Sequence, residues 1–189
     1  YVVTVARVFT VRSNFWRLQK GCWGLEEQCL GDGLPVSIEK GRAYFRQLGI
    51  EERVREFDVS SATVELAAKA VGVIPARIAK TLSFWTKEGV ILVLAAGDAR
   101  IDNKKFKSRF AAKAKMLDAS EVLHLVGYPV GGVCPFGIDK DIPVYLDVSL
   151  KRFDTVFPSA GSANSAIELS CDELFRYSNA LEWVDVCKL

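Results

Sequence analysis

The run VILVLAA at residues 90–96 constrains the fold more than any other feature of this sequence. Seven consecutive apolar residues leave no polar face, so the segment is predicted to be a strand buried on both faces of a sheet. The preceding segment KTLSFWT, residues 80–86, is rich in β-branched and aromatic residues and is predicted to be a second strand. Because only Lys87, Glu88 and Gly89 separate the two runs, a tight turn is expected to join them.

Amphipathic segments lie on both sides of this strand pair. Helices are predicted at 37–49, 61–72, 102–117, 118–126 and 171–178, and further strands at 142–150, at 181–186 and in a hairpin over 154–170. Asp118 with Glu121, and Ser170 with Glu173, have the spacing of capping boxes at helix starts. Strands joined by tight turns and mixed with helices indicate an α/β or α+β domain and not a doubly wound parallel sheet.

Length and charge narrow the class of protein. The 189 residues suit one medium domain, or one domain with a small appendage. A net charge of +2 excludes binding to nucleic acid by bulk charge but allows a local basic patch. The longest apolar run, seven residues, is far too short to span a membrane, so no membrane partner is expected.

The cysteines indicate a reducing, cytoplasmic compartment. There are five, an odd number, and none forms a C-x-x-C pair, which argues against a zinc site and a disulfide framework. His124 is the only histidine, so any nucleophilic mechanism that needs a histidine base depends on it.

The first 36 residues differ from the rest of the chain. They carry two of the four tryptophans and two of the five cysteines without a clean period, and the regular pattern begins near Ser37. We interpret residues 1–36 as an extension, a tag remnant or translated upstream sequence, and residues 37–189 as the functional domain.

The glycine- and proline-rich loop VGYPVGGVCPFGI, residues 126–138, allows three interpretations. Its glycine spacing fits neither common phosphate-binding motif. Cys134 could be a nucleophile, but a small apolar filler is the commoner role of such a residue. Gly131 and Gly132 could instead leave main-chain N–H groups open to a substrate carbonyl, with Pro135 fixing the turn, or could simply make a tight connection.

Two sets of basic residues are further candidates. Lys80, at the start of a predicted strand, could bind a carbonyl or carboxyl group, or could extend its charge into solvent. Six positive and no negative residues lie from Lys104 to Lys115, on a helix whose basic face is either merely solvated or contacts phosphates. Asp139 and Asp147 are isolated and do not indicate paired-carboxylate chemistry.

Five segments in this order resemble one family: IAKTLSF, GDARIDNKKF, VGYPVGGVCPFGI, VYLDVSL and AGSANSAIEL. They look like the YbaK family, also called the prolyl-tRNA synthetase-associated or aminoacyl-tRNA deacylase domain, over residues 37–189. The resemblance implies a mixed, partly barrel-like sheet surrounded by helices. It also implies hydrolysis of the ester in mischarged tRNA, often tRNA for proline carrying Cys, Ala, Ser or Thr, with no metal and no cofactor. An aminoacyl-tRNA synthetase is a second partner to consider.

The resemblance assigns roles to individual residues. Lys80 would anchor the substrate, and Gly131 and Gly132, followed by Pro135 and Gly137, would line the pocket around the ester. Because no protein nucleophile with a matching base is visible, the attacking group would be the substrate's own thiol or hydroxyl, or a water held by the terminal ribose. The sequence does not choose between these.

Selectivity and tRNA contact would come from other segments. Some relatives that remove alanine carry a histidine where this chain reads VYLDVSL, so alanine specificity is in doubt. The residues expected at the amino-acid pocket are Phe57, Ser60, Ser61, Thr63, Cys134 and Asp147, although the Ser/Thr cluster also suits a helix N-cap. Lys104, Lys105 and Lys107 would contact tRNA phosphates. The alternatives are a non-catalytic module that binds tRNA or a synthetase, and a thiol enzyme that uses Cys134.

Overall fold

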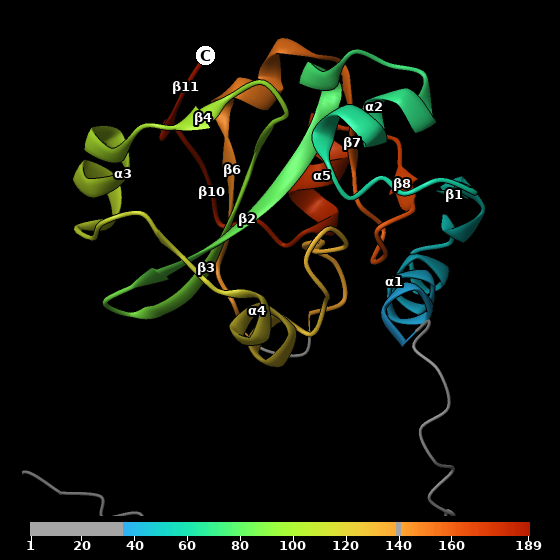
Figure 1. Ribbon diagram of the computed structural model, residues 1–189, viewed down its shortest axis with the longest axis horizontal. Helices are drawn as coiled ribbons and strands as arrows, with labels where there is room; N and C mark the ends of the chain where they lie inside the picture. Colours follow the sequence, from blue (N-terminus) through green and yellow to red (C-terminus); the bar gives the residue numbers. More distant parts are fainter. Residues whose placement is uncertain (1–35, 139–140) are drawn as a thin grey trace, which may run out of the picture. The chain divides into compact units, whose positions relative to one another are not determined.

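The computed structural model describes residues 36–138 and 141–189, and the predicted extension at 1–36 lies almost wholly outside them. The described part is a mixed α+β fold with a curled, half-barrel sheet, as predicted (Figure 1). The helices are α1 (Val36–Gln47), α2 (Val64–Val71), α3 (Asn103–Phe110), α4 (Ala119–Val126) and α5 (Cys171–Tyr177). Short 3-10 helices cover Glu51–Arg53, Pro75–Arg77 and Val148–Arg152.

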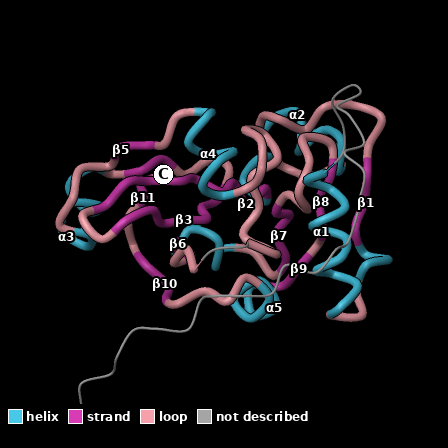
Figure 2. The backbone as a smooth tube through the Cα atoms, turned by 90° about the horizontal axis from the view of Figure 1, so that it is seen from below, coloured by secondary structure: helices cyan, strands magenta, loops and turns pink. Residues whose placement is uncertain are grey.

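The main sheet is built on the predicted strand pair, which is confirmed as β2 (Ile78–Thr86) and β3 (Gly89–Ala96). These long antiparallel strands cross the middle of the molecule, and Figure 2 shows α3 and α2 at opposite ends of them. The strand order is β10-β6-β3-β2-β7-β9, with β5 also paired to β2. The shorter strands are β5 (Lys115–Met116), β6 (Val144–Asp147), β7 (Thr155–Pro158), β9 (Leu169–Ser170) and β10 (Glu182–Val184).

One edge of β2 is interrupted in the middle. At its start, β7 pairs in parallel with Ile78 and Ala79, and near its end β5 pairs with Phe84 and Trp85. Neither strand pairs with residues 80–83, which therefore have a strand neighbour, β3, on one side only. This open edge is the feature that positions the candidate site.

Two further pairs of strands lie outside the main sheet. β1 (Val54–Glu56) pairs with β8 (Ser165–Ile167), and β4 (Arg100–Ile101) pairs with β11 (Cys187–Lys188). The hairpin predicted over 154–170 is confirmed: β7 pairs antiparallel with β9 in the register Thr155–Ser170 and Val156–Leu169, and an isolated bridge in the same register links Ser159 to Ala166. The returning arm was not predicted to be divided, and its first part, β8, pairs with β1.

The predicted helix at 102–117 is too long. It ends at Phe110, because Ala111 takes a left-handed conformation with φ 50°, and the chain then extends into β5. The strand predicted at 142–150 is also shorter, since Asp147 accepts a hydrogen bond from the Ser149 N–H at 2.9 Å and caps a 3-10 helix. The two capping boxes, at Asp118 and Ser170, are confirmed.

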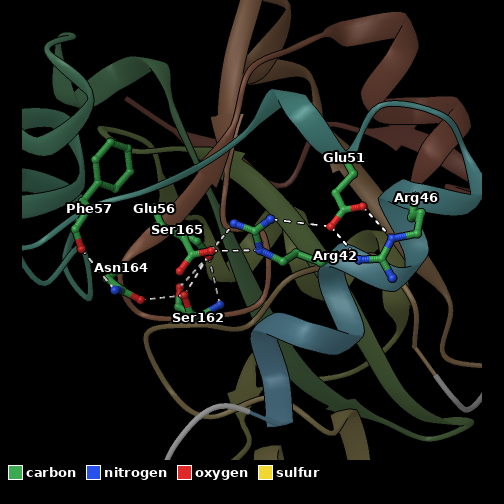
Figure 3. Close-up of polar contacts among 8 residues, drawn as sticks. All are labelled: Arg42, Arg46, Glu51, Glu56, Phe57, Ser162, Asn164 and Ser165. Carbon is green, nitrogen blue, oxygen red and sulfur yellow. Dashed lines mark hydrogen bonds and ion pairs between the residues drawn. The ribbon is translucent and has the colours of Figure 1, made fainter.

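The α1 helix is fastened to the β1–β8 pair by charge and by close packing (Figure 3). Arg42 hydrogen-bonds to Glu56 in β1 and forms an ion pair with Glu51 at 3.5 Å. Gly41 lies so close to the loop before β8 that an added Cβ would stand 1.9 Å from the Ala160 carbonyl oxygen. The helix thereby supports the loop at 159–165, which forms one wall of the site described next.

Candidate functional site

A cavity of about 280 Å³ lies along the open edge of β2. Its walls come from four parts of the chain: residues 61–64 with the start of α2, residues 78–83 of β2, the loop at 130–133, and the loop before β8. Met116, Leu117 and Val122 close the remaining side. The sequence signals at Lys80, Thr63 and Gly131 therefore meet in one place although they are far apart in the chain.

Lys80 is the only charged residue among the described residues that line the cavity. Its ammonium group donates to the Gly97 carbonyl at 3.0 Å and to the Ala99 carbonyl. Burial lowers the pKa of Lys80, because the partly apolar surroundings disfavour the charged form. An ammonium has three N–H donors, so two carbonyl partners leave one for a further acceptor.

The two adjacent glycines allow three segments to approach one another closely. Gly131 has φ 88°, and an added Cβ there would lie 2.9 Å from the Ala62 Cβ. At Gly132 it would lie 2.9 Å from the main chain of Ser162. The Gly132 N–H donates to the Pro129 carbonyl at 3.0 Å, so it is used within the loop. The Gly131 N–H makes no hydrogen bond with any described residue, which leaves it as the available donor of the pair.

Cys134 and Pro135 do not reach this cavity. The Cys134 side chain is fully buried, its thiol points to the Phe136 carbonyl at 3.7 Å, and burial raises the pKa of the thiol to about 11. Pro135 and Gly137 instead line a second hollow of about 380 Å³, together with Tyr44 of α1. The apolar-filler interpretation of Cys134 fits this geometry, and the thiol-enzyme alternative loses its nucleophile because a protonated, enclosed thiol is unreactive.

Asp147 also has a structural place. It is 1% exposed, and its carboxylate accepts from the main-chain N–H groups of Ser149, Val186 and Cys187 at 2.9, 2.9 and 3.1 Å. It does not line the cavity. The predicted contact of Asp147 with the substrate does not fit this position. Its carboxylate instead fixes the C-terminal segment through the N–H groups of Val186 and Cys187.

The Phe57–Thr63 segment contributes only in part. Thr63 and Ser61 line the cavity, and Thr63 is at the same time the N-cap of α2, where it accepts from the Leu66 N–H at 3.3 Å. Phe57 and Ser60 are not lining residues. The main chain of Phe57 is instead paired with Asn164 through two hydrogen bonds, of 2.8 and 3.1 Å (Figure 3).

The basic helix α3 lies apart from the cavity, and none of its residues lines it. Lys105 forms an ion pair with Asp185 at 2.7 Å and donates to the Cys187 carbonyl at 3.0 Å. Lys104 and Lys107 are exposed on the same helix. Lys105 therefore ties α3 to the end of the chain, and the other two lysines remain as candidates for phosphate contact.

Four residues that line the cavity were not among those predicted for the site: Ser83, Phe157, Ser159 and Ser165. Ser83 and Ser165 nevertheless lie within the family-like segments IAKTLSF and AGSANSAIEL. The hydroxyls of Ser159 and Ser165 are engaged within the loop before β8, where each bonds to the Ser162 carbonyl. Ser83 could have been noticed as a small polar residue between the large apolar ones of a central strand.

Two searches of the described residues gave no site. None of their helices is long and apolar enough to cross a membrane. Within the same residues, histidine, cysteine, aspartate and glutamate do not gather in a group that could hold a metal ion.

Comparison with known proteins gives a consistent result. A family model described as the aminoacyl-tRNA editing domain matches residues 58–177. "Uncharacterized protein YwhH" of Bacillus subtilis is 55% identical over 154 residues, which are 81% of this chain and 98% of that protein. "Putative Cys-tRNA(Pro)/Cys-tRNA(Cys) deacylase EbsC" of Enterococcus faecalis is 29% identical over 62% of this chain and 73% of that protein.

A solved structure has the same fold. "Crystal structure of a putative trans-editing enzyme for prolyl tRNA synthetase" superposes with a TM-score of 0.74 and 27% identity, covering 83% of this chain and all of that one. The family model spans every segment that forms the cavity wall, from residues 61–64 to the loop before β8. On this evidence the chain belongs to the aminoacyl-tRNA editing domain family.

Proposed function

We propose that the protein is an aminoacyl-tRNA deacylase that hydrolyses the ester between a wrongly attached amino acid and the 3′ end of a tRNA. The observation that carries the proposal is the cavity at the open edge of β2, whose lining includes both Lys80 and Gly131, the residue with an available N–H donor. The substrate we favour is a tRNA for proline that carries a small amino acid. The family membership and the name of the EbsC relative support this choice.

The chemistry follows from these two donors. Attack on the ester carbon turns the carbonyl oxygen into an oxyanion, and a fixed N–H donor such as that of Gly131 stabilises that charge. Lys80 offers its remaining N–H to an oxygen of the substrate. The attacking group is a water, or the hydroxyl or thiol of the substrate itself, and it gives up its proton as it bonds to the carbonyl carbon. When the tetrahedral intermediate collapses, the bond to the ribose oxygen breaks, and that oxygen takes up a proton in balance with the one released.

A deacylation panel tests the proposal. The protein is incubated with tRNA for proline charged with Ala, Cys, Ser, Thr or Pro, and loss of the charged species is followed over time. Hydrolysis of at least one mischarged tRNA, with Pro-tRNA spared, supports a deacylase. If no species is hydrolysed while tRNA binding is measurable, the binding-module alternative takes its place.

Cys134→Ala is expected to keep at least half of the deacylation rate. The thiol is enclosed and protonated, so the variant loses only a small buried group outside the cavity. The measurement is kcat/KM on the preferred charged tRNA, with a thermal melt beside it. A fall of a hundredfold in a variant that is still folded would restore the thiol-enzyme alternative.

The double variant Lys104→Glu with Lys107→Glu is expected to weaken tRNA binding and to reduce the slope of log K against log salt by about two, one for each lost phosphate contact. Lys105 is left intact because its ion pair with Asp185 supports the fold.

The matched control is Lys69→Glu with Lys87→Glu, which makes the same change in net charge at exposed positions outside α3. Binding is measured by titration with uncharged tRNA at several salt concentrations. If the control pair weakens binding as much as the α3 pair, the contact is not located on α3.

A further inference from the structure

The open edge of β2 presents main-chain groups to the cavity. The Ser83 carbonyl accepts from the Leu117 N–H at 3.2 Å, so the main chain of Ser83 points away from β3. Since this direction alternates along a strand, the main chain of Thr81, two residues earlier, points the same way. Neither β5 nor β7 pairs with Thr81. Its N–H and carbonyl therefore face the cavity that occupies the gap.

Two side-chain hydroxyls beside this edge have no hydrogen-bond partner in the part of the chain that the structure describes. The Thr81 hydroxyl is fully enclosed and makes no hydrogen bond, and it is the only such side-chain atom among the described residues. Ser83 is 4% exposed and lines the cavity, and its hydroxyl likewise bonds to no described residue. Residues two apart on a strand point to the same face, so these hydroxyls share one side of β2.

An unpartnered buried hydroxyl is unfavourable, and most such groups in folded proteins are hydrogen-bonded. Ser83 differs from Thr81 because its hydroxyl is not fully enclosed and so is accessible from the cavity. Beside Ser83, the cavity is lined by the apolar residues Met116 and Leu117, and Val122 is a further apolar lining residue. A ligand that fits here is small and brings one neutral polar atom.

We propose that Ser83 is a specificity-determining residue that hydrogen-bonds the side chain of the attached amino acid. The site then selects a hydroxyl or thiol side chain, as in serine and cysteine, over an apolar side chain of equal size. This inference rests on the proposed deacylase function. All aminoacyl esters share an α-ammonium group and an ester carbonyl. Main-chain atoms of Thr81 and Gly131 would bind these two groups, and Ser83 would contact the side chain that differs between amino acids.

The test compares two esters of nearly equal size on the same tRNA. Seryl-tRNA and 2-aminobutyryl-tRNA differ by a hydroxyl in place of a methyl group, so size cannot explain a difference between them. The native protein is expected to hydrolyse the seryl ester with a kcat/KM at least about tenfold higher. Ser83→Ala is expected to lower the seryl value by about tenfold and to leave the aminobutyryl value within about twofold.

Ser178→Ala is the matched control. Ser178 is 3% exposed, as buried as Ser83, but its hydroxyl donates to the Leu174 carbonyl at 2.7 Å and it lies outside this cavity. We expect the control to lower the melting temperature and to keep the preference for seryl-tRNA. Ser83→Ala should melt at the same temperature as the native protein or higher, because it loses no hydrogen bond.

Each other outcome counts against the inference in a recognisable way. Equal losses on both esters in Ser83→Ala, or a native preference for the aminobutyryl ester, would overturn it and leave the deacylase function standing. If the native protein hydrolyses neither ester nor any other charged tRNA in the panel, the deacylase function itself fails, and the inference fails with it.

Discussion

Lys80→Met is expected to lower kcat/KM on the preferred charged tRNA by about a hundredfold or more. A loss of this size is typical when an enzyme loses one hydrogen-bond donor to the oxyanion that forms in the transition state. Methionine keeps an unbranched side chain of similar length but has no charge and no N–H group. The loss should fall on turnover, because Lys80 is a lining residue of the cavity proposed to hold the ester and does not lie at a distant tRNA contact.

The free energy of unfolding of Lys80→Met distinguishes a role of Lys80 in catalysis from a role in holding the fold together. Lys80 donates to the Gly97 and Ala99 carbonyls, and the variant leaves both without that donor. Against this, burial lowers the pKa of Lys80, which means that the fold disfavours its charge at neutral pH. The two effects oppose each other, so the free energy of unfolding should change by less than about 2 kcal/mol. A variant that is unfolded, or folded and fully active, would contradict the assignment.

The pH profile gives a second check on Lys80. The folded pKa lies below the ordinary value of 10.5, so the ammonium is lost at a lower pH than an exposed lysine would lose it. After subtraction of uncatalysed ester hydrolysis, the enzymatic rate should fall as the pH rises through this lowered pKa. Lys80→Met should lack this alkaline fall, and a native-like fall in the variant would assign it to another group.

Gly41→Ala is expected to destabilise the protein by about 3 kcal/mol, the upper range for forcing an extra methyl group into a packed site. The added Cβ would stand 1.9 Å from the Ala160 carbonyl oxygen, and a main-chain atom cannot rotate away as a side chain can. Either α1 or the loop before β8 must move. Because that loop forms one cavity wall, deacylation should fall in the molecules that remain folded.

Gly49→Ala is the control for this substitution. Gly49 has φ 71°, so alanine there is strained, but no atom lies within 4 Å of the added Cβ. We expect a cost of about 1 kcal/mol from the backbone alone and no effect on activity. Both variants are compared by denaturant unfolding and by kcat/KM. Equal losses of stability would show that contact between α1 and the loop contributes nothing.

Much of the fold could be predicted from local pattern. The apolar run at 90–96 and its β-branched neighbour predicted the central strand pair, and the spacing of Ser170 and Glu173 predicted a helix start, because both signals act over a few residues. The end of the helix predicted at 102–117 and the pairing of β8 could not be predicted in this way. The helix ends where Ala111 takes a left-handed conformation that alanine seldom adopts, and β8 pairs with β1, which lies far earlier in the chain.

The candidate site shows the same division. Lys80, Gly131 and Thr63 were found from motif and composition, and all line the cavity. Asp147 was misassigned because its partners, the N–H groups of Val186 and Cys187, lie about forty residues further along the chain. Ser83 was missed because what distinguishes it is the lack of a partner, and that depends on where two neighbouring strands stop.

The break in the pairing along β2 has a consequence for how such a site can diverge. Every amino acid except proline carries the same main-chain N–H and carbonyl, so a recognition edge made of these groups survives most substitutions of the residues that carry it. Related proteins could carry a different side chain at position 83 and so select another amino acid, while the main-chain groups that hold the ester stay the same. The gap between β5 and β7 thus keeps main-chain groups available for the ester, and the side chain at position 83 determines which amino acid is accepted.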